Sequence, residues 1–398
     1  MALDTATLLR GREQGGWISL QLAEQTPIPP DLLPGGDGLM MSSAGSSGGR
    51  QVCLQPWCHL DRSAQATAAW LEEIGLDPAD LLILNPLPLH HVSGLMPWWR
   101  SRCWGARYQV LSSLLMKRPV ELLQFCEALD EWDFGSTVVS LVPTQLQRLL
   151  AHRAGVVWLQ SCAVVWVGGS ALPETVAELA RRHGVRLAPC YGATETAAMV
   201  AAQQPEQFLA GRSGCGSPLA DVELRLDDDG ALMVRTARLA VARWSEQRPN
   251  QLQDVSDQDG WWRSGDVASL TQELRIQGRL DGAIQSGGET VFPEQLEARL
   301  MRWVDEHQIA VESVLLLGEL DPEWGERLVA LVRPRPAQTS RHDQLLKALG
   351  DGCHAWSAAE RPRRWIICSD LAAGPLGKWQ RGRWRAWLSD EGKRRHSG

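Results

Sequence analysis

The chain has 398 residues, enough for one large domain and a smaller one, because single hydrophobic cores usually stop growing beyond ~250–300 residues. Hydrophobic residues make up 44% and charged residues 22%, as in folded globular proteins, and the formal net charge is -7. This charge gives no reason to expect a nucleic-acid or anionic-membrane partner, and no apolar run approaches the ~20 residues of a membrane-spanning helix.

The predicted elements follow an irregular N-terminal stretch that is rich in Pro and Gly between Pro27 and Gly38. Short apolar or β-branched runs then alternate with helical spacing, a pattern typical of a parallel α/β sheet. The predicted strands are Val52–Leu54, Leu81–Leu84, Thr137–Val142, Ala163–Val167 and Val185–Ala188, and the predicted helices are Leu114–Leu129, one that opens at Pro143, and Pro173–His183.

Beyond Gly214 the sequence changes to shorter β-rich pieces, VELRL, ALMVRT and LRIQGRL, with a predicted acidic and aromatic turn, DQDGWWRSGD, before the last. Past Asp281 the pattern predicts a small α+β unit. It contains a helix at Pro293–Val304, strands VESVLLLG and RLVALVRP, a helix near Asp343–Leu349 and a basic tail. We therefore place a domain boundary near Leu280–Gly282, between domains 1–280 and 281–398.

The segment APCYGATETAAM, residues 188–199, carries the strongest functional signal. A strand reaches a Tyr191-Gly192 corner, Thr194 and Glu195 follow, and small helix-forming residues come next. The carboxyl ends of strands are where open α/β sheets bind ligands. A nucleotide could use the ring for stacking, the hydroxyl for a phosphate and the carboxylate for Mg²⁺. Alternatively, Thr194 and Glu195 only cap a following helix.

A second segment rich in small residues, SSAGSSGGR, spans Ser42 to Arg50. Such residues allow backbone N–H groups to converge on phosphate oxygens. It is not a Walker loop, because no Gly-Lys-Ser/Thr closes it, and a flexible Ser/Gly linker is the alternative. The apolar run before it and the predicted strand after it favour an ordered hairpin loop.

Two further motifs follow predicted strands. His90 and His91 could line a substrate pocket or move a proton, or one could be packed and the other solvated. Gly168 and Gly169 would let a flat ring approach the backbone, or they form only a tight turn.

Later motifs place polar groups beside glycines. Asp266, in RSGD, could bind both hydroxyls of a ribose or only cap its turn. Glycines also interrupt the strand-like segments Gly278–Asp281 and Ser286–Pro293. Lys378, in PLGK, is one of only four lysines beside 36 arginines, although an isolated lysine is usually a solvated surface residue.

In this order, these segments resemble the ANL superfamily of adenylate-forming enzymes, which includes acyl- and aryl-CoA ligases, luciferases and peptide-synthetase adenylation domains. The resemblance covers about residues 39–381. Within the superfamily, the o-succinylbenzoate–CoA ligases of menaquinone and phylloquinone biosynthesis are most similar. The segments that carry this closer resemblance are LPLHHVSGL, VSLVPTQLQRLL, GGSALP, YGATET and SGGETVFPEQLE.

The resemblance implies an α/β fold, with a large N-terminal adenylation domain of mostly parallel layered sheets and a small mobile α+β C-terminal domain. It implies a two-step reaction in which a substrate carboxylate attacks the α-phosphate of MgATP, and CoA then displaces AMP from the acyl-AMP. ATP, Mg²⁺ and the co-substrate CoA are thereby expected. Phosphoryl transfer depends mainly on positioning and charge neutralisation.

The resemblance also implies roles for the nucleotide-binding motifs. Tyr191 and Gly192 match the corner that packs on adenine, with Gly168 and Gly169 lining that pocket. The phosphate loop matches Ser43, Gly45, Ser46, Ser47 and Gly48. Thr194 matches the hydroxyl that contacts a phosphate, and Glu195 matches the Mg²⁺ ligand. Asp266, with Arg279 beside it, matches the residue that binds the ribose.

Four further roles concern catalysis and domain motion. Lys378 matches the catalytic lysine that bridges the attacking carboxylate and the α-phosphate. Asp281 matches the hinge about which the small domain rotates between half-reactions. Gly287 and Gly288 would face the CoA thiol, and His91 matches a position on the acyl-pocket wall.

The sequence departs from the family pattern in three places. The phosphate loop has Arg50 but no lysine, which predicts altered ATP affinity. Family members carry a longer stretch before this loop, so we expect an abbreviated N-terminal subdomain. Gly282 follows the hinge, where an acidic residue is common in the family.

Three functions therefore remain open. The leading one is o-succinylbenzoate–CoA ligase, the second is another aryl- or acyl-CoA ligase, and the third is a non-catalytic nucleotide-binding relative. The expected partners are a small carboxylic acid, ATP and CoA, and a homodimer is compatible with the sequence. Nine scattered cysteines and no signal peptide favour a reduced, cytoplasmic location.

Overall fold

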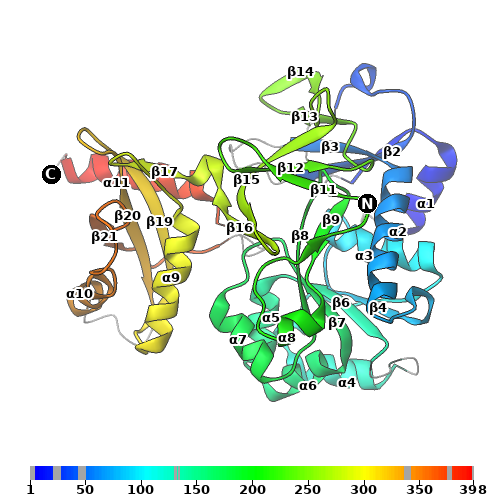
Figure 1. Ribbon diagram of the computed structural model, residues 1–398, viewed down its shortest axis with the longest axis horizontal. Coiled ribbons are helices and arrows are strands. Elements are labelled where there is room, and N and C mark those ends of the chain that lie inside the picture. Colours follow the sequence, from blue (N-terminus) through cyan, green and yellow to red (C-terminus); the bar gives the residue numbers. More distant parts are fainter. Residues whose placement is uncertain are drawn as a thin grey trace. The chain divides into compact units, whose positions relative to one another are not determined.

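The computed structural model describes residues 5–20, 28–43, 51–129, 132, 135–335, 342–373 and 379–396. Contacts divide the chain into two compact units (Figure 1). The first comprises residues 1–172, 176–264 and 269–276, and the second comprises 173–175, 265–268 and 277–398. A domain boundary at residues 280–281 stays a prediction. Within the described ranges, no helix has the length and apolar character needed to cross a bilayer.

A seven-stranded sheet lies in the first unit, with strand order β10-β9-β8-β7-β6-β4-β5. The strands from β8 to β5 pair in parallel, whereas β9 and β10 are antiparallel to their neighbours. The central strands are apolar and buried along most of their length, as expected for strands covered on both faces. The bounds are β4 Leu82–Asn85, β5 Arg107–Val110, β6 Thr137–Leu141, β7 Cys162–Val167, β8 Leu187–Ala193, β9 Ala198–Ala202 and β10 Ser217–Pro218.

Helices cover both faces of this sheet (Figure 1). On one face, apolar side chains of α4 to α8 share a buried cluster with Leu84, Val139 and Val165 of the strands. On the other face α2 and α3 pack together, and α3 contacts β4, β6 and β9. The bounds are α2 Trp57–Glu73, α3 Val92–Trp104, α4 Pro119–Glu127, α5 Pro143–Leu150, α6 Arg153–Ser161, α7 Glu174–Arg182 and α8 Pro205–Leu209.

Two further sheets contain the remaining strands before residue 280, in the orders β1-β2-β3-β13-β14 and β11-β12-β15-β16. Strands β2 and β3 are antiparallel, with Ser43 opposite Gln51, so they bracket the predicted hairpin loop, whose residues 44–50 lie outside the described ranges. The bounds are α1 Thr5–Gln14, β1 Trp17–Ser19, β2 Gly38–Ser43, β3 Gln51–Pro56, β11 Glu223–Leu226, β12 Ala231–Arg235, β13 Ala242–Ser245, β14 Arg248–Gln253, β15 Trp261–Leu270 and β16 Leu274–Arg279; short 3-10 helices are η1 Pro30–Leu32, η2 Pro78–Asp80, η3 Leu115–Lys117 and η4 Leu280–Gly282.

The second unit is built on a sheet of order β18-β17-β20-β19, with β21 added parallel to β20. Alternate residues of a strand point to opposite faces. Accordingly, Leu316 packs with apolar residues of α9 and α10, whereas Leu315 and Leu317 pack with those of α11. The bounds are β17 Ile284–Ser286, β18 Glu289–Val291, α9 Pro293–Glu306, β19 Val311–Asp321, β20 Gly325–Pro334, α10 His342–Gly352, β21 Arg364–Ile367 and α11 Arg381–His396.

The predicted α/β class is confirmed, but several predicted elements were wrong. The supposed turn DQDGWWRSGD contains the start of β15, and the basic tail contains α11. The predicted helix Leu114–Leu129 breaks before α4, because proline disfavours helical backbone at the preceding Arg118. Helices α1, α2, α3, α6 and α8 were not predicted.

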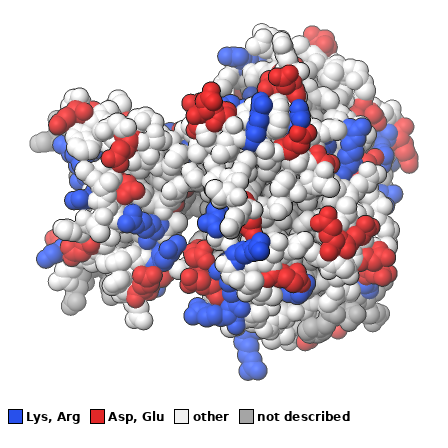
Figure 2. Space-filling model, viewed as in Figure 1, with Lys and Arg blue, Asp and Glu red and all other residues white. Residues whose placement is uncertain are grey.

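Charged side chains of both signs are interspersed on the face shown in Figure 2. Several form ion pairs, such as Arg263 with Asp227 at 2.6 Å and with Asp229 at 2.7 Å. Exposed pairs of this kind contribute little to stability.

A buried ion cluster ties α11 to α9 and β19 in the second unit. The Arg381 guanidinium lies 3.0 Å from Glu294 Oε1 and 2.8 Å from Glu297 Oε2. The backbone N–H of Leu316 donates to Glu297 Oε1 at 2.7 Å, and the Leu316 carbonyl accepts from Arg381 Nη1 at 2.7 Å. Burial raises the pKa of Glu297 to about 7. The positive charge of Arg381 therefore offsets the free-energy cost of placing two carboxylates near each other, one of them buried.

Replacing Arg381 with Met should destabilise the second unit by ~3–5 kcal/mol, because a buried carboxylate then loses its cation. The pKa of Glu297 would rise further above its unfolded value, so the folded variant binds a proton that it must release as pH increases. Its deficit in urea midpoint should thus be larger at about pH 8 than at about pH 5. The matched control is Arg385→Met, an exposed position on the same helix. Equal deficits in the two variants, or a deficit that shrinks as pH rises, would contradict this account.

Candidate active site

The turn between β8 and β9 carries the two polar groups that the sequence singled out. β8 ends at Ala193, and the chain returns as the antiparallel strand β9, which excludes the alternative that Thr194 and Glu195 cap a following helix. Ala197 and Ala198 have φ values of 50° and 84°, in the left-handed region that residues with a Cβ rarely adopt. This turn is therefore strained and depends on contacts from elsewhere.

Hydrogen bonds to backbone carbonyls hold the first half of the turn. Gln55 Nε2, from β3, donates to the Thr194 carbonyl at 2.9 Å and to the Glu195 carbonyl at 3.1 Å. The Ala240 N–H also donates to the Glu195 carbonyl, at 2.7 Å. Both residues are distant in sequence, so the backbone of the turn is fixed by tertiary structure.

The Ala197 carbonyl accepts from Ser63 Oγ of α2 at 2.6 Å. Within the turn, Thr196 Oγ1 accepts from the Ala193 N–H at 3.1 Å and donates to the Ala198 carbonyl at 2.6 Å. These bonds replace the helical ladder that the local sequence favours.

The side chains of Thr194 and Glu195 are available to a ligand. Glu195 is only 8% exposed, and Thr194 is half-buried. No described residue forms a hydrogen bond with the Thr194 hydroxyl or pairs with the Glu195 carboxylate. A largely buried carboxylate without a protein partner is costly unless a cation or donor from a ligand meets it. Oxygen ligands of this kind suit Mg²⁺.

Beside this turn, glycines leave the backbone without side chains. A Cβ at Gly168, directly after β7, would lie 3.0 Å from Cys190 Sγ of β8. A Cβ at Gly192 would lie 2.3 Å from the Ala198 carbonyl oxygen, and Gly169 has a φ of 83°. Half-buried Tyr191 lies in β8 between Cys190 and Gly192. The structure thus brings Gly168, Gly169, Tyr191, Gly192, Thr194 and Glu195 to neighbouring strands.

The histidine pair lies at the carboxyl edge of the same sheet, after β4, which is two strands away from β7. His91 is the N-cap of α3, and its carbonyl accepts from the Leu95 N–H at 2.9 Å. Its ring centroid lies 4.3 Å from that of His90, whose pKa burial lowers.

Asp266, Arg279 and Asp281 form one group in the second unit. Arg279 Nη1 lies 3.3 Å from Asp266 Oδ1, and Arg279 Nε lies 3.1 Å from Asp281 Oδ1. Asp266 lies in β15 instead of the predicted turn, where Gly265 adopts a φ of 76°. A Cβ at Gly265 would come within 3.2 Å of Arg279 Nη2.

Gly287 and Gly288 form the turn between β17 and β18, with φ values of 58° and 85°. A Cβ at Gly287 would lie 2.6 Å from the Trp324 ring. Lys378, Gly45, Ser46, Ser47 and Gly48 lie outside the described residues, as does the side chain of Ser43.

Sequence reasoning missed Arg100, which is buried in the middle of α3 with 4% exposure. Its guanidinium lies 5.3 Å from the centroid of the Trp166 ring of β7. Its Nε has no hydrogen-bond partner, and none of the described acidic residues forms an ion pair with it. Burial lowers the Arg100 pKa to about 10, so the side chain remains a cation near neutral pH. The available signal was a lone arginine in the apolar context MPWWRS.

Comparison with known proteins finds a match to one family model. Residues 57–237 match the model of the AMP-binding enzyme family. The 2-succinylbenzoate–CoA ligase of Escherichia coli (strain K12) is 36% identical over 250 residues, which are 63% of this chain and 49% of that protein. The indoleacetate–CoA ligase of Aromatoleum aromaticum is 27% identical over 91% of this chain and 70% of its own length. The chain thus spans about half the length of the first of these relatives.

Solved structures support the fold. The o-succinylbenzoate CoA synthetase of Bacillus subtilis, in complex with the acyl-adenylate intermediate OSB-AMP, superposes with a TM-score of 0.71 at 22% identity, covering 87% of this chain and 68% of that one. Wild-type Escherichia coli MenE, with a bound analogue of OSB-AMS, gives a TM-score of 0.62 at 28% identity, covering 90% and 73%.

Replacing Gly192 with Ala should lower the free energy of unfolding by ~1–3 kcal/mol, because the added Cβ would overlap the backbone carbonyl of Ala198. Urea unfolding followed by tryptophan fluorescence measures the effect. Gly35→Ala is the control, since a Cβ there meets nothing within 4 Å. Equal stabilities of the two variants would show that the β8–β9 turn tolerates a side chain.

Proposed function

We propose that this chain, whose residues 57–237 match the AMP-binding enzyme family, is an ATP-dependent acid–CoA ligase that activates o-succinylbenzoate as acyl-AMP and transfers the acyl group to CoA. The observation that carries the proposal is a pair of polar side chains, Thr194 and Glu195, that have no hydrogen-bond or ion-pair partner among the described residues and lie on a fixed turn beside glycine backbone. Adenylation needs metal-held phosphates and a flat pocket for adenine, and this turn offers groups for both.

In the proposed adenylation step, Glu195 would hold Mg²⁺, and the Thr194 hydroxyl would donate to a phosphate oxygen. Bound Mg²⁺ would supply neutralisation of phosphate charge. Tyr191 packs on adenine, which lies against the backbone of Gly168 and Gly169. The hydrogen bonds that Gln55 donates to the Thr194 and Glu195 carbonyls hold the backbone of both residues, and thereby their side chains, in place during the reaction.

The residues of the second unit complete the proposal. Asp266 binds the ribose, oriented by its ion pair with Arg279, and Asp281 acts as the hinge. Gly287 and Gly288 face the CoA thiol, and Lys378 bridges the carboxylate and the α-phosphate. His91 contributes to the wall of the acyl pocket.

Arg100 supports a substrate with two carboxylates. A buried guanidinium without an acidic partner is costly, and an anionic group of a ligand would offset that cost. o-Succinylbenzoate has one carboxylate to activate and a second, remote one to pair. We therefore assign Arg100 to the second carboxylate.

A reduced, cytoplasmic setting agrees with nine cysteines that are all free of disulfides. The homodimer stays a prediction.

The activity test is mass-spectrometric detection of CoA thioesters after incubation of the protein with MgATP, CoA and a panel of acids. The panel contains o-succinylbenzoate, indoleacetate, benzoate and a medium-chain fatty acid. We expect o-succinylbenzoyl-CoA to dominate. Dominant indoleacetyl-CoA would keep the reaction and change the substrate, and the absence of both AMP and thioester would favour a non-catalytic relative.

Replacing Arg100 with Met should raise the KM for o-succinylbenzoate by ~10- to 100-fold, because a hydrogen bond to a charged group is lost. The KM for benzoate should stay constant or fall, since no charge is then left unpaired. Steady-state kinetics with both acids measure this difference, and an unchanged KM for ATP shows that the fold is intact. Equal effects on both acids would remove Arg100 from the substrate site.

A further inference from the structure

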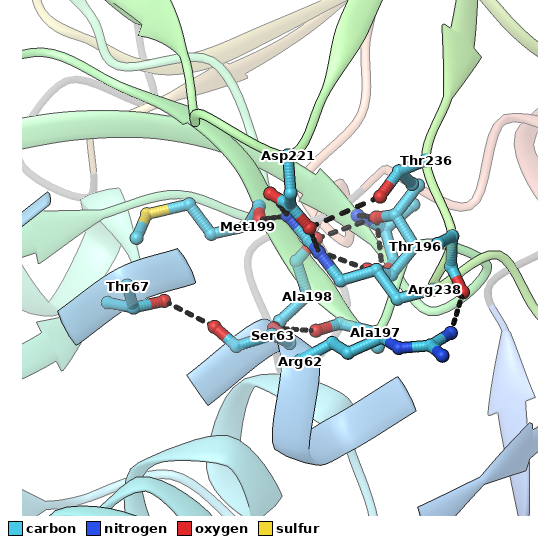
Figure 3. Close-up of polar contacts among 12 residues, drawn as sticks. Arg62, Ser63, Thr67, Thr196, Ala197, Ala198, Met199, Asp221, Thr236 and Arg238 are labelled. Atoms are coloured by element: carbon cyan, nitrogen blue, oxygen red, sulfur yellow. Dashed lines mark hydrogen bonds and ion pairs between the residues drawn. The ribbon is translucent and has the colours of Figure 1, made fainter. Parts of the chain in front are cut away.

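A second buried arginine, Arg238, donates hydrogen bonds to backbone carbonyls in the second half of the β8–β9 turn. Its side chain is completely buried and comes from the segment between β12 and β13. Nη1 donates to the Thr196 carbonyl at 2.5 Å, and Nη2 donates to the Met199 carbonyl at 2.9 Å. Figure 3 shows the guanidinium between these carbonyls and Asp221. The two carbonyls flank the left-handed pair, Ala197 and Ala198.

Asp221 makes this burial tolerable. Arg238 Nε lies 2.6 Å from Asp221 Oδ2, and Nη2 lies 3.2 Å from Oδ1, so the planar fork meets both carboxylate oxygens. The Thr236 hydroxyl donates to Oδ2 at 3.3 Å (Figure 3). The charge of Arg238 is thus compensated by a carboxylate, in contrast with that of Arg100. The fixed shape of its guanidinium can therefore hold the two carbonyls of the turn at a set spacing.

The same short segment also reaches the near half of the turn, because the Ala240 N–H donates to the Glu195 carbonyl. Arg238 and Ala240 therefore hold the backbone on both sides of the strained pair. The Glu195 carbonyl is itself one of these attachment points, and the Glu195 carboxylate forms no hydrogen bond or ion pair with a described residue. The direction of its carboxylate depends on the backbone of this turn.

We propose that Arg238, paired with Asp221, is a positioning residue that presents the Glu195 carboxylate to the metal ion. The proposal rests on the proposed function for the role of Glu195. The physical basis is that residues which orient a metal ligand control metal affinity without contacting the metal. A lysine at position 238 would keep the charge, but its N–H groups all belong to one nitrogen, whereas three different nitrogens of the guanidinium bind the two carbonyls and the carboxylate here.

The test compares Arg238→Lys with Arg263→Lys in ATP–pyrophosphate exchange as a function of Mg²⁺ concentration. Arg263 is a matched control, since it also pairs with aspartates but lies away from the turn. For Arg238→Lys we expect the half-saturating Mg²⁺ concentration to rise ~10-fold or more, as is typical when the support of a metal ligand is lost. The KM for the acid should change less than about twofold, because its own contacts remain. Equal Mg²⁺ dependence in the two variants would overturn the proposal.

Amide hydrogen exchange of residues 194–199 separates this proposal from the proposed function and from general destabilisation. In Arg238→Lys, exchange of these residues should accelerate more than exchange in the rest of the first unit, and in Arg263→Lys it should not accelerate. Unchanged exchange in Arg238→Lys would overturn the proposal that Arg238 fixes the backbone of the turn, even if activity fell. If the unmodified chain catalyses no pyrophosphate exchange with any acid, the proposed function fails. Faster amide exchange in Arg238→Lys would then still show that Arg238 fixes the backbone of the turn, but the proposed role of Arg238 in presenting Glu195 to a metal ion would be rejected.

Discussion

The strained β8–β9 turn is stable only because its backbone carbonyls are hydrogen-bonded from outside. Donors from β3, from α2 and from residues 236–240 converge on the carbonyls of residues 194–199. Left-handed φ values at two alanines cost free energy that these bonds offset. The same bonds tie the seven-stranded sheet to the neighbouring sheet and to the helix that lies over it. One local constraint thus contributes both to the packing of the first unit and to the direction of the Thr194 and Glu195 side chains.

The two buried arginines of the first unit illustrate two uses of one side chain. Arg238 is satisfied by a carboxylate and two carbonyls, which is the pattern of a structural support. Arg100 has an aromatic ring beside it but no anion among the described residues, which is the pattern of a ligand-binding group. Burial alone does not separate these roles. The distinguishing feature is whether the protein itself supplies the hydrogen-bond acceptors.

Much of the fold could be predicted from local sequence. The apolar runs that became β4, β6 and β7 end in Asn, Pro or Gly, and their strand character does not depend on distant residues. The segment after Glu195 is Ala-rich, which left a following helix as the alternative interpretation, whereas long-range bonds from Gln55, Ser63 and Arg238 select a hairpin. The motif residues of the turn were found because their types suit a nucleotide. Arg100 was missed because its burial and its lack of a partner appear only in three dimensions.

The antiparallel pairing of β8 with β9 has a consequence for folding. The hairpin closes over a short sequence distance, so it can form early, whereas the parallel pairs of the same sheet need longer crossovers. The residues that fix its turn lie up to 140 positions away, between Gln55 and Glu195. The hairpin can therefore exist before its turn has the final shape. The direction of the carboxylate at the turn therefore depends on long-range contacts that the hairpin does not make by itself.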